Sequence, residues 1–330
     1  MAGLIASARH PTALLTSALG LSFAALVLVL AVPGLAVAQD THVLVVAGVG
    51  GDEEHVKTFH QWASSVVETA KKQGVAPDNV AYLGESTGAA TRASRDNVTK
   101  AFADMAARAK ANDEIFVLLI GHGSFDGRRG VFNLSGPDLT AEDYGKLLAR
   151  FPTQKIAFVN TASSSGAFLE PLKGPARTIV TATRTGGERN ETRFPEYFVE
   201  ALASEAADRD RNGRVSVLEA FDYATAKVKA TYEQGGHILT EHATLDDGAQ
   251  GKLAATLFLA PVRSRTAAAQ AADPATRALL EQRDDLERRV GELRLRKDGM
   301  EAARYEEELE QLLTELALKT KAIRDLEGQK

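Results

Sequence analysis

The sequence predicts an α/β protein with a mostly parallel six-stranded sheet, helices on both faces of that sheet, and a C-terminal α-helical hairpin. Two patterns indicate this. Short, almost continuously apolar runs alternate with amphipathic stretches of helical period, which is typical of a parallel sheet covered on both faces. After residue 275 the chain becomes densely charged, with leucines at steps of three and four, which is typical of paired helices.

The first 38 residues have the layout of an export signal. Arg9 precedes an apolar run from about Leu14 to Leu35, which ends in Ala36-Val37-Ala38 with small residues at the −3 and −1 positions. The alternative is a retained membrane anchor, because the run approaches spanning length. We expect cleavage after Ala38. The product would be an exported protein, periplasmic or secreted, with no membrane span left.

The composition argues against disulfides as a source of stability and against nucleic acid as a partner. The chain has no cysteine, so an exported form cannot depend on disulfides. Its formal net charge is −5 and it contains no basic block, which argues against nucleic acid as a partner. Because no disulfide can form, the folded state must be stabilised by its hydrophobic core, by a metal ion, or by both.

Residues 39–262 form the predicted α/β domain. Helical spacing covers Glu53–Lys72, Ser94–Lys110 and Thr140–Phe151, and the last of these opens with a Thr140-x-x-Asp143 cap. The six expected strands are Thr41–Gly48, Asn79–Leu83, Glu114–Ile120, Lys155–Asn160, Arg177–Ala182 and Lys252–Leu259. Parallel sheets of this kind bind ligands beyond the carboxyl ends of their strands, so the loops there are the candidate site.

Residues 263–275 are predicted to be a linker, and residues 276–330 an antiparallel hairpin. In the latter, 26 of 55 residues are charged, and two leucine-rich sets fall out of phase across Lys297-Asp298-Gly299. Asp-Gly at a change of phase indicates a turn. The alternative is one continuous coiled coil that dimerises. In either form, this region is a candidate for association with a partner.

Residues 208–219 match a twelve-residue calcium loop of the EF-hand type. The six predicted ligands are Asp208, Asp210, Asn212, the carbonyl of Arg214, Ser216 and Glu219. Gly213 occupies the sharp turn that such a loop requires at position six. The neighbouring arginines weaken the attraction for a dication. We therefore expect a weak structural Ca²⁺ site, with a dissociation constant on the order of 10⁻⁴ M. The alternative is a solvated loop between helices.

A histidine and a serine follow two of the expected strands. Gly121-His122-Gly123 follows the third strand, and Ala162-Ser163-Ser164-Ser165-Gly166 follows the fourth. If these strands are neighbours, an imidazole and a hydroxyl face each other beside glycine amides that could bind an oxyanion. The spacing alone favours the alternative, a strand-capping histidine and a serine-rich turn, because both residues are common in loops.

The two loops resemble the histidine and cysteine loops of the caspase–legumain–gingipain superfamily of cysteine peptidases. The resemblance spans Thr41 to Pro261 and implies a caspase-like fold. His122 matches the catalytic histidine and Ser163 takes the position of the nucleophile. The backbone amides of Gly123 and Ser163 match the oxyanion hole.

The resemblance continues into Val180–Gly187, which in the superfamily forms one wall of the primary specificity pocket. It implies that Thr183, Arg184 and the nearby Glu188 contact a substrate.

Serine in place of cysteine changes the expected activity. A thiolate forms readily at neutral pH, whereas a serine hydroxyl needs a tightly hydrogen-bonded base. We therefore expect a degenerate site, in a pseudopeptidase that binds peptides or a protein partner. One alternative is an active endopeptidase or transpeptidase with Ser163 as nucleophile and His122 as acid/base. Another is an assembly scaffold that acts through the helical hairpin.

Overall fold

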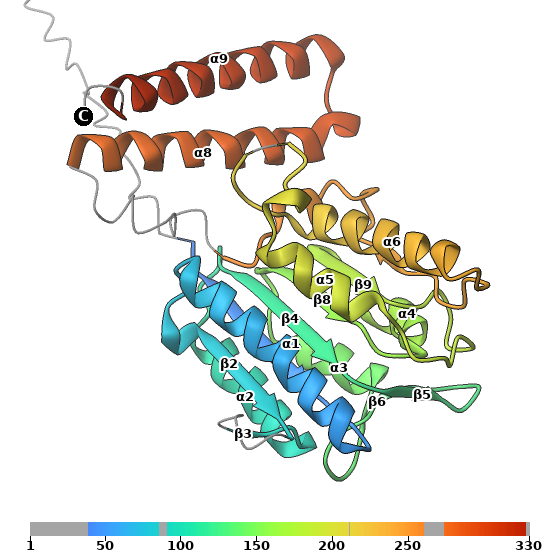
Figure 1. Cartoon of the computed structure of the whole chain (residues 1–330). Helices are drawn as coiled ribbons and strands as arrows, with labels where there is room; N and C mark the ends of the chain where they lie inside the picture. Colours follow the sequence, from blue (N-terminus) through green and yellow to red (C-terminus); the bar gives the residue numbers. More distant parts are fainter. Residues whose placement is uncertain (1–38, 86–90, 211, 261–273, 328–330) are drawn as a thin grey trace, which may run out of the picture. The chain divides into compact units, whose positions relative to one another are not determined.

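The computed structural model describes residues 39–85, 91–210, 212–260 and 274–327 (Figure 1). The predicted signal peptide and residues 263–273 of the predicted linker lie outside the described residues. Within the part of the chain that is described, no helix combines the length and apolar character needed to cross a membrane.

The central sheet has seven strands in the order β10-β9-β8-β4-β1-β2-β3. All neighbours pair in parallel except β10 with β9, which is antiparallel. The α/β class and the mostly parallel sheet are thereby confirmed. The strands are β1 Thr41–Ala47, β2 Val80–Gly84, β3 Thr91–Arg92, β4 Glu114–Ile120, β8 Lys155–Asn160, β9 Arg177–Thr181 and β10 Thr244–Asp246.

Helices cover both faces of the sheet (Figure 1). One core contains side chains of α1 (Glu53–Lys72), α5 (Phe194–Ala203) and α6 (Val217–Gln234). The opposite core contains side chains of α2 (Arg95–Arg108), α3 (Ala141–Leu148) and the single turn α4 (Leu169–Leu172). The predicted cap of α3 is present as a capping box between Thr140 and Asp143.

The two cores share the central strands. All seven residues of β4 are buried, with Leu118 in the core under α1 and Leu119 in the core under α2 and α3. A strand buried on both faces shows no alternation in its sequence, which is why the runs are almost continuously apolar. Each large side chain buried there contributes about 1.5–3 kcal/mol of transfer free energy.

A second, three-stranded antiparallel sheet was not predicted. It has the order β5-β6-β7 and consists of β5 Gly123–Phe125, β6 Gly130–Phe132 and β7 Leu139–Thr140. Strand β5 begins directly after His122, so this sheet fixes the path of the chain beyond the candidate histidine.

The prediction of six strands ending with Lys252–Leu259 is wrong. The sheet ends instead with the short antiparallel strand β10 and gains β3 at its other edge. Residues Ala254–Thr256 form a 3₁₀ turn because the Asp247 carboxylate accepts hydrogen bonds from the backbone amides of Leu253 and Ala254, at 2.9 and 3.1 Å. Only Phe258 in this segment makes a β-bridge, and its partner is Ser216.

The C-terminal region forms the expected pair of helices. Helix α8 (Pro274–Arg296) and helix α9 (Ala302–Glu327) are joined by a 3₁₀ turn at Lys297–Gly299, where the leucine pattern changes phase. Their shared core contains Leu286, Val290, Leu293, Tyr305 and Leu312. The two helices therefore form a hairpin rather than one continuous rod.

The buried carboxyl group of Glu114 predicts a pH-dependent stability. Burial raises its pKa to about 7, although the nearby charges of Lys155 and Arg214 oppose the shift. The folded state therefore favours the protonated carboxyl group. The contribution of Glu114 to the free energy of unfolding is fully present below the ordinary pKa of 4.5 and is lost as pH rises through about 7. Glu114→Gln should match wild type near pH 4 and exceed its stability at pH 8 by about 3 kcal/mol.

Thermal unfolding followed by circular dichroism between pH 4 and pH 8 measures this difference. Glu68→Gln, at a carboxylate that is 72% exposed, serves as the matched control and should follow wild type throughout. Parallel curves for wild type and Glu114→Gln would contradict the prediction.

Candidate functional site

The candidate site lies where β4 and β8 end. These strands are parallel neighbours, with Leu119 in register with Asn160. Parallel strands end at the same edge of a sheet, so the loop that carries His122 and the loop that carries Ser163 emerge side by side. They touch directly: a Cβ atom on Gly123 would lie 2.6 Å from the carbonyl oxygen of Ser163.

The hydroxyl of Ser163 is bonded to the backbone of the histidine loop. Its Oγ donates to the carbonyl oxygen of Gly123 at 3.0 Å, and the Gly123 amide approaches the same Oγ at 3.4 Å. The residue is only 8% exposed. The serine proton is therefore directed at a backbone carbonyl, and the Gly123 amide expected in the oxyanion hole faces the hydroxyl itself.

His122 is held by a different backbone group. Its Nε2 lies 3.2 Å from the carbonyl oxygen of Gly50. A carbonyl can only accept, so Nε2 carries the proton in this contact. The ring packs edge-on against Phe59, with centroids 5.2 Å apart. Among the described residues, no hydrogen bond joins His122 to Ser163.

A second histidine lies beside His122, and the sequence analysis did not select it. The rings of His55 and His122 have centroids 5.0 Å apart. His55 bonds to Asp52 at 2.6 Å and to Glu191 at 3.1 Å. The hydrogen bond that His55 donates to Asp52 raises the pKa of His55, and Glu191 adds to the shift. The Asp52-x-x-His55 spacing at a helix start was a usable signal, whereas the contact with Glu191 joins distant parts of the chain.

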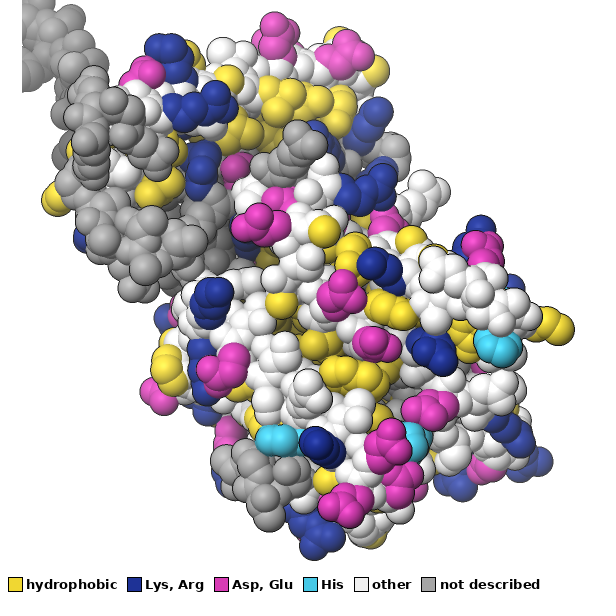
Figure 2. All heavy atoms as spheres, in the orientation of Figure 1, with side chains coloured by type: hydrophobic (Ala, Val, Ile, Leu, Met, Phe, Trp, Pro, Cys, Tyr) yellow, Lys and Arg dark blue, Asp and Glu magenta, His cyan; other side chains and the backbone are white. Residues whose placement is uncertain are grey.

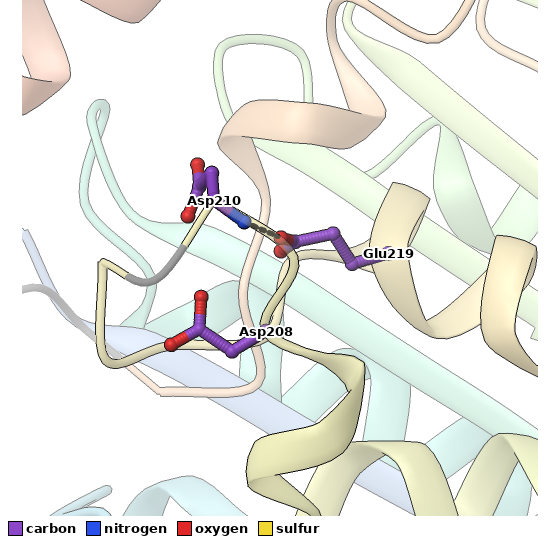
Figure 3. A group of neighbouring side chains, drawn as sticks. All are labelled: Asp208, Asp210 and Glu219. Atoms are coloured by element: carbon purple, nitrogen blue, oxygen red, sulfur yellow. Dashed lines mark hydrogen bonds between the residues drawn. The ribbon is translucent and has the colours of Figure 1, made fainter.

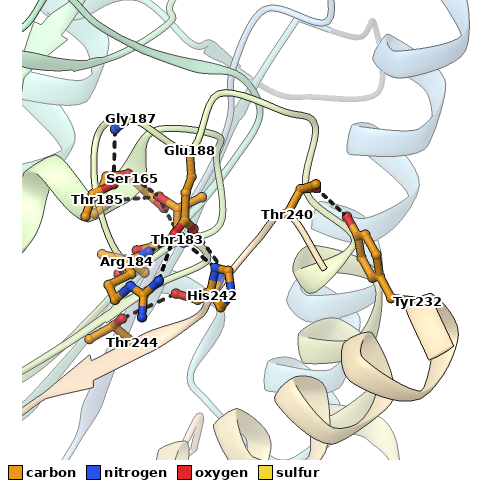
Figure 4. Close-up of polar contacts among 12 residues, drawn as sticks. Ser165, Thr183, Arg184, Thr185, Gly187, Glu188, Tyr232, Thr240, His242 and Thr244 are labelled. Carbon is orange, nitrogen blue, oxygen red and sulfur yellow. Dashed lines mark hydrogen bonds and ion pairs between the residues drawn. The ribbon is translucent and has the colours of Figure 1, made fainter. Parts of the chain in front are cut away.

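Thr183, one of the predicted substrate-contacting residues, is fully buried. Its hydroxyl oxygen accepts from the Gly166 amide at 2.8 Å and lies 3.2 Å from the hydroxyl of Ser165 (Figure 4). Thr183 thereby ties the segment after β9 to the loop of Ser163. It shapes the site through the backbone, and its side chain is not exposed to a ligand.

Glu188 and Arg184 lie at the outer side of the same segment. One oxygen of Glu188 accepts from the amides of Arg184 and His242, at 3.1 and 2.9 Å. Its other oxygen lies 3.0 Å from the His242 ring (Figure 4). The Arg184 guanidinium lies 4.0 Å from a carboxylate oxygen of Glu188. The Arg184 side chain is 64% exposed, whereas that of Glu188 is 15% exposed.

Acidic side chains and histidines gather over this end of the α/β domain (Figure 2). Asp52 and Glu191 are 58% and 64% exposed, and Glu53 and Glu54 are also exposed. The rim beside His55 and His122 is therefore predominantly anionic.

Three carboxylates of the predicted calcium loop converge. One oxygen from each of Asp208, Asp210 and Glu219 lies within 4.8 Å of the others (Figure 3). A carboxylate cluster of this size suits a hard cation that prefers oxygen ligands. Burial raises the pKa of Asp210, and the charges of Glu219 and Asp208 add to the shift. Among the described residues, this is the one acidic or histidine cluster compact enough to hold a metal ion.

The rest of the loop is held by local hydrogen bonds. The Asn212 side chain accepts from the Arg214 amide at 2.9 Å, and Gly213 has a positive φ of 82°. Ser216 is the N-cap of α6 and forms a capping box with Glu219. The Ser216 hydroxyl donates to Glu219 at 2.8 Å, so it already has a partner within the loop.

The loop pairs with the segment that was predicted as a sixth strand. Ser216 forms an antiparallel bridge with Phe258, and the Val217 amide donates to the Leu257 carbonyl at 2.9 Å. The guanidinium of Arg214 lies 3.4 Å from the centre of the Phe258 ring. The Arg209 guanidinium contacts Asp222 at 3.1 Å. Both arginine charges are thus engaged by neighbours.

Comparison with known proteins adds little to this geometry. No protein-family model matches the chain, and a search of curated proteins finds no match either. The crystal structure of the Drosophila initiator caspase Dronc is similar at 9% identity and a TM-score of 0.42, covering 63% of this chain and 79% of that chain. A similarity this low carries no argument about activity. The α/β class rests on the strand order, and the site rests on its own contacts.

The contact between the two loops predicts an intolerance for side chains at position 123. A Cβ atom there would meet the carbonyl oxygens of Ser163 at 2.6 Å and Val131 at 3.0 Å, and backbone atoms cannot move aside cheaply. Gly123→Ala should destabilise the protein by about 1–3 kcal/mol, as overpacking does. At Gly187 a Cβ atom would meet only Thr185, at 3.5 Å. Gly187→Ala is therefore the control, and equal melting temperatures for the two variants would contradict the close approach.

Proposed function

We propose that this protein is an exported, calcium-stabilised relative of the caspase–legumain–gingipain peptidases that binds a peptide or protein segment without hydrolysing it. One observation supports the loss of hydrolysis above all: the Ser163 hydroxyl donates to the Gly123 carbonyl at 3.0 Å instead of to a base. The export signal, the caspase-like family and the calcium ion are parts of the same proposal.

Nucleophilic attack by serine requires a base that takes its proton as the bond forms. His122 directs its protonated Nε2 at the Gly50 carbonyl. Ser163 is 8% exposed, so a substrate carbonyl would have little access to Oγ. Both candidate groups are held by backbone atoms, and this arrangement favours a rigid binding edge over a reacting pair.

The proposed ligand meets the carboxyl edge of the sheet. Asp52 and Glu191 supply exposed carboxylates beside His55 and His122, and the side chain of Arg184 is also exposed. Charges of both signs would orient a bound segment more than they would strengthen its binding. The formal charge of −5 supports a peptide or protein over nucleic acid.

For the metal, Asp208, Asp210 and Glu219 would supply carboxylate oxygens, and the Asn212 side chain and Arg214 carbonyl would complete the set. An all-oxygen donor set on a loop with glycine at its turn favours calcium over transition metals. The ion would neutralise mutually repelling carboxylates and so stabilise the junction between the loop and α6.

The test of activity compares wild type, Ser163→Ala and Ser163→Cys in turnover of a mixed fluorogenic peptide library with calcium present. We expect no turnover by wild type or by Ser163→Ala. Peptide binding, measured by fluorescence anisotropy, should be retained in both.

Wild-type turnover that disappears in Ser163→Ala would make the protein a serine-dependent hydrolase and overturn the proposal. Turnover by Ser163→Cys alone would leave the proposal intact, because it would show that only the nucleophile was lost. Absence of peptide binding in all three proteins would also count against it.

Calcium binding is tested by titration calorimetry and thermal unfolding. We expect wild type to bind one Ca²⁺ with a dissociation constant on the order of 10⁻⁴ M and to gain stability as calcium rises. Glu219→Gln should weaken binding at least tenfold, because a bidentate carboxylate becomes an amide. Chelation should return wild type to the stability measured without added calcium.

Asp222→Asn is the matched control. Asp222 is a nearby acidic residue that pairs with Arg209 and lies outside the carboxylate cluster. It should bind calcium like wild type. Equal calcium affinity in Glu219→Gln and wild type would remove the loop from the proposal.

A further inference from the structure

Helix α9 has an apolar face that α8 does not cover. Leu313 and Leu318 are 41% and 63% exposed, and they are among the few large hydrophobic side chains exposed in the described residues. With Ala317 and the half-buried Leu309 they line a shallow groove of about 620 Å³ along the helix. We call this face of α9, from Glu306 to Lys321, the outer stripe. The space-filling view shows hydrophobic side chains exposed on the hairpin (Figure 2).

Charged residues border the outer stripe asymmetrically. Glu306 and Glu310 line its N-terminal half, and Lys321 lines its C-terminal end. Glu306 and Lys321 are separated by about 22 Å along the helix axis at 1.5 Å per residue. The stripe is therefore negative at one end, apolar in the middle and positive at the other end.

The outer stripe is complementary to its own reversed copy. Consider a second α9 that runs antiparallel to the first and is centred on the same point, between Leu313 and Thr314. Glu306 of one copy then lies level with Lys321 of the other, and Glu310 lies level with Ala317. The same arrangement places Leu309 level with Leu318, and Leu313 beside its own equivalent. Every described residue that lines the groove thus has its counterpart in the same groove. A two-fold interface needs this property, because one surface must serve both partners.

We propose that two copies of this protein associate through the outer stripes of their α9 helices, packed antiparallel about a two-fold axis. Charge selects the direction. Antiparallel packing brings Lys321 of each copy to Glu306 and Glu310 of the other. Parallel packing would set the glutamates of both copies at the same level, where like charges repel.

Lys321 is available for such a contact. Within its own helix it pairs with Asp325 at 3.1 Å, but the two side chains are 75% and 58% exposed. An exposed pair of this kind is worth at most about 1 kcal/mol, so Lys321 can exchange partners at little cost. Burial of the leucines supplies most of the affinity, and the charges set orientation.

A contact made by a single helix from each copy is smaller than a standard interface. We therefore expect a reversible dimer with a dissociation constant on the order of 10 µM.

The experiment is a charge exchange followed by sedimentation velocity on the purified protein. One variant carries Lys321→Glu, and the other carries Glu306→Lys with Glu310→Lys. Each should weaken self-association at least tenfold, because in a dimer of either variant like charges meet at both ends of the interface. Mixing the two variants makes both ends attractive again. The mixture should form a heterodimer with an affinity within a few-fold of wild type.

Glu315→Lys is the control: Glu315 is exposed on α9 and does not line the groove, so this variant should dimerise like wild type. Restoration in the mixture also shows that both variants fold. A monomeric wild type at 100 µM, dimers that survive either charge change, or a mixture that stays monomeric would each overturn the proposal.

The absence of native cysteine permits a direct test of the contacting face. Leu313 meets its own equivalent across the proposed axis, so Leu313→Cys should form a disulfide-linked dimer under mild oxidation. Glu315→Cys should not. Equal cross-linking of the two variants would contradict a contact through the outer stripe.

Discussion

The candidate site depends on the parallel pairing of β4 with β8. Leu118 and Leu119 of β4 enter opposite cores, so a shift of one residue would exchange the side chains that each core receives. Burial on both faces therefore fixes the register of these strands. Because the register is fixed, the turns that follow the strands are held close enough for Ser163 to bond to the backbone of Gly123.

This constraint gives Ser163 a structural role. Its hydroxyl donates to the Gly123 carbonyl and lies within reach of the Gly123 amide, so it joins the two loops. A thiol is a weaker donor and acceptor than a hydroxyl and is also larger. Serine suits this narrow contact better than cysteine would. The same hydrogen bond directs the hydroxyl proton at the Gly123 carbonyl, whereas His122 lies against the Gly50 carbonyl.

Sequence reasoning succeeded where the signal was local or strongly buried. The apolar runs of β1, β4 and β8 are signals of this kind. So is the contiguous loop from Asp208 to Glu219, as far as the convergence of its three carboxylates. It failed where pairing between distant segments decides the structure. The short strand β10 pairs with β9 across more than sixty residues of sequence. The apolar residues of Lys252–Leu259 look like a strand, but Asp247 binds the amides of a turn there. For the same reason the sequence pointed to His122 but not to the neighbouring His55, whose second partner is Glu191.

The predicted calcium loop is held in place although the described residues contain no second loop of this kind. Paired loops normally support each other through a short β-bridge, and here Phe258 provides that bridge to Ser216. Glu219 is already fixed by the Ser216 hydroxyl and by the Arg209 amide, at 2.8 and 2.9 Å. Val217, the first residue of α6, is buried in the core under α1. Asp208 is held in the same way by the amides of Asn212 and Gly213, at 3.1 and 2.7 Å, so a cation arriving at this loop would bind carboxylates that the loop already positions. Since α6 is held by the core in either case, the ion would lock the junction between loop and helix without moving the helix.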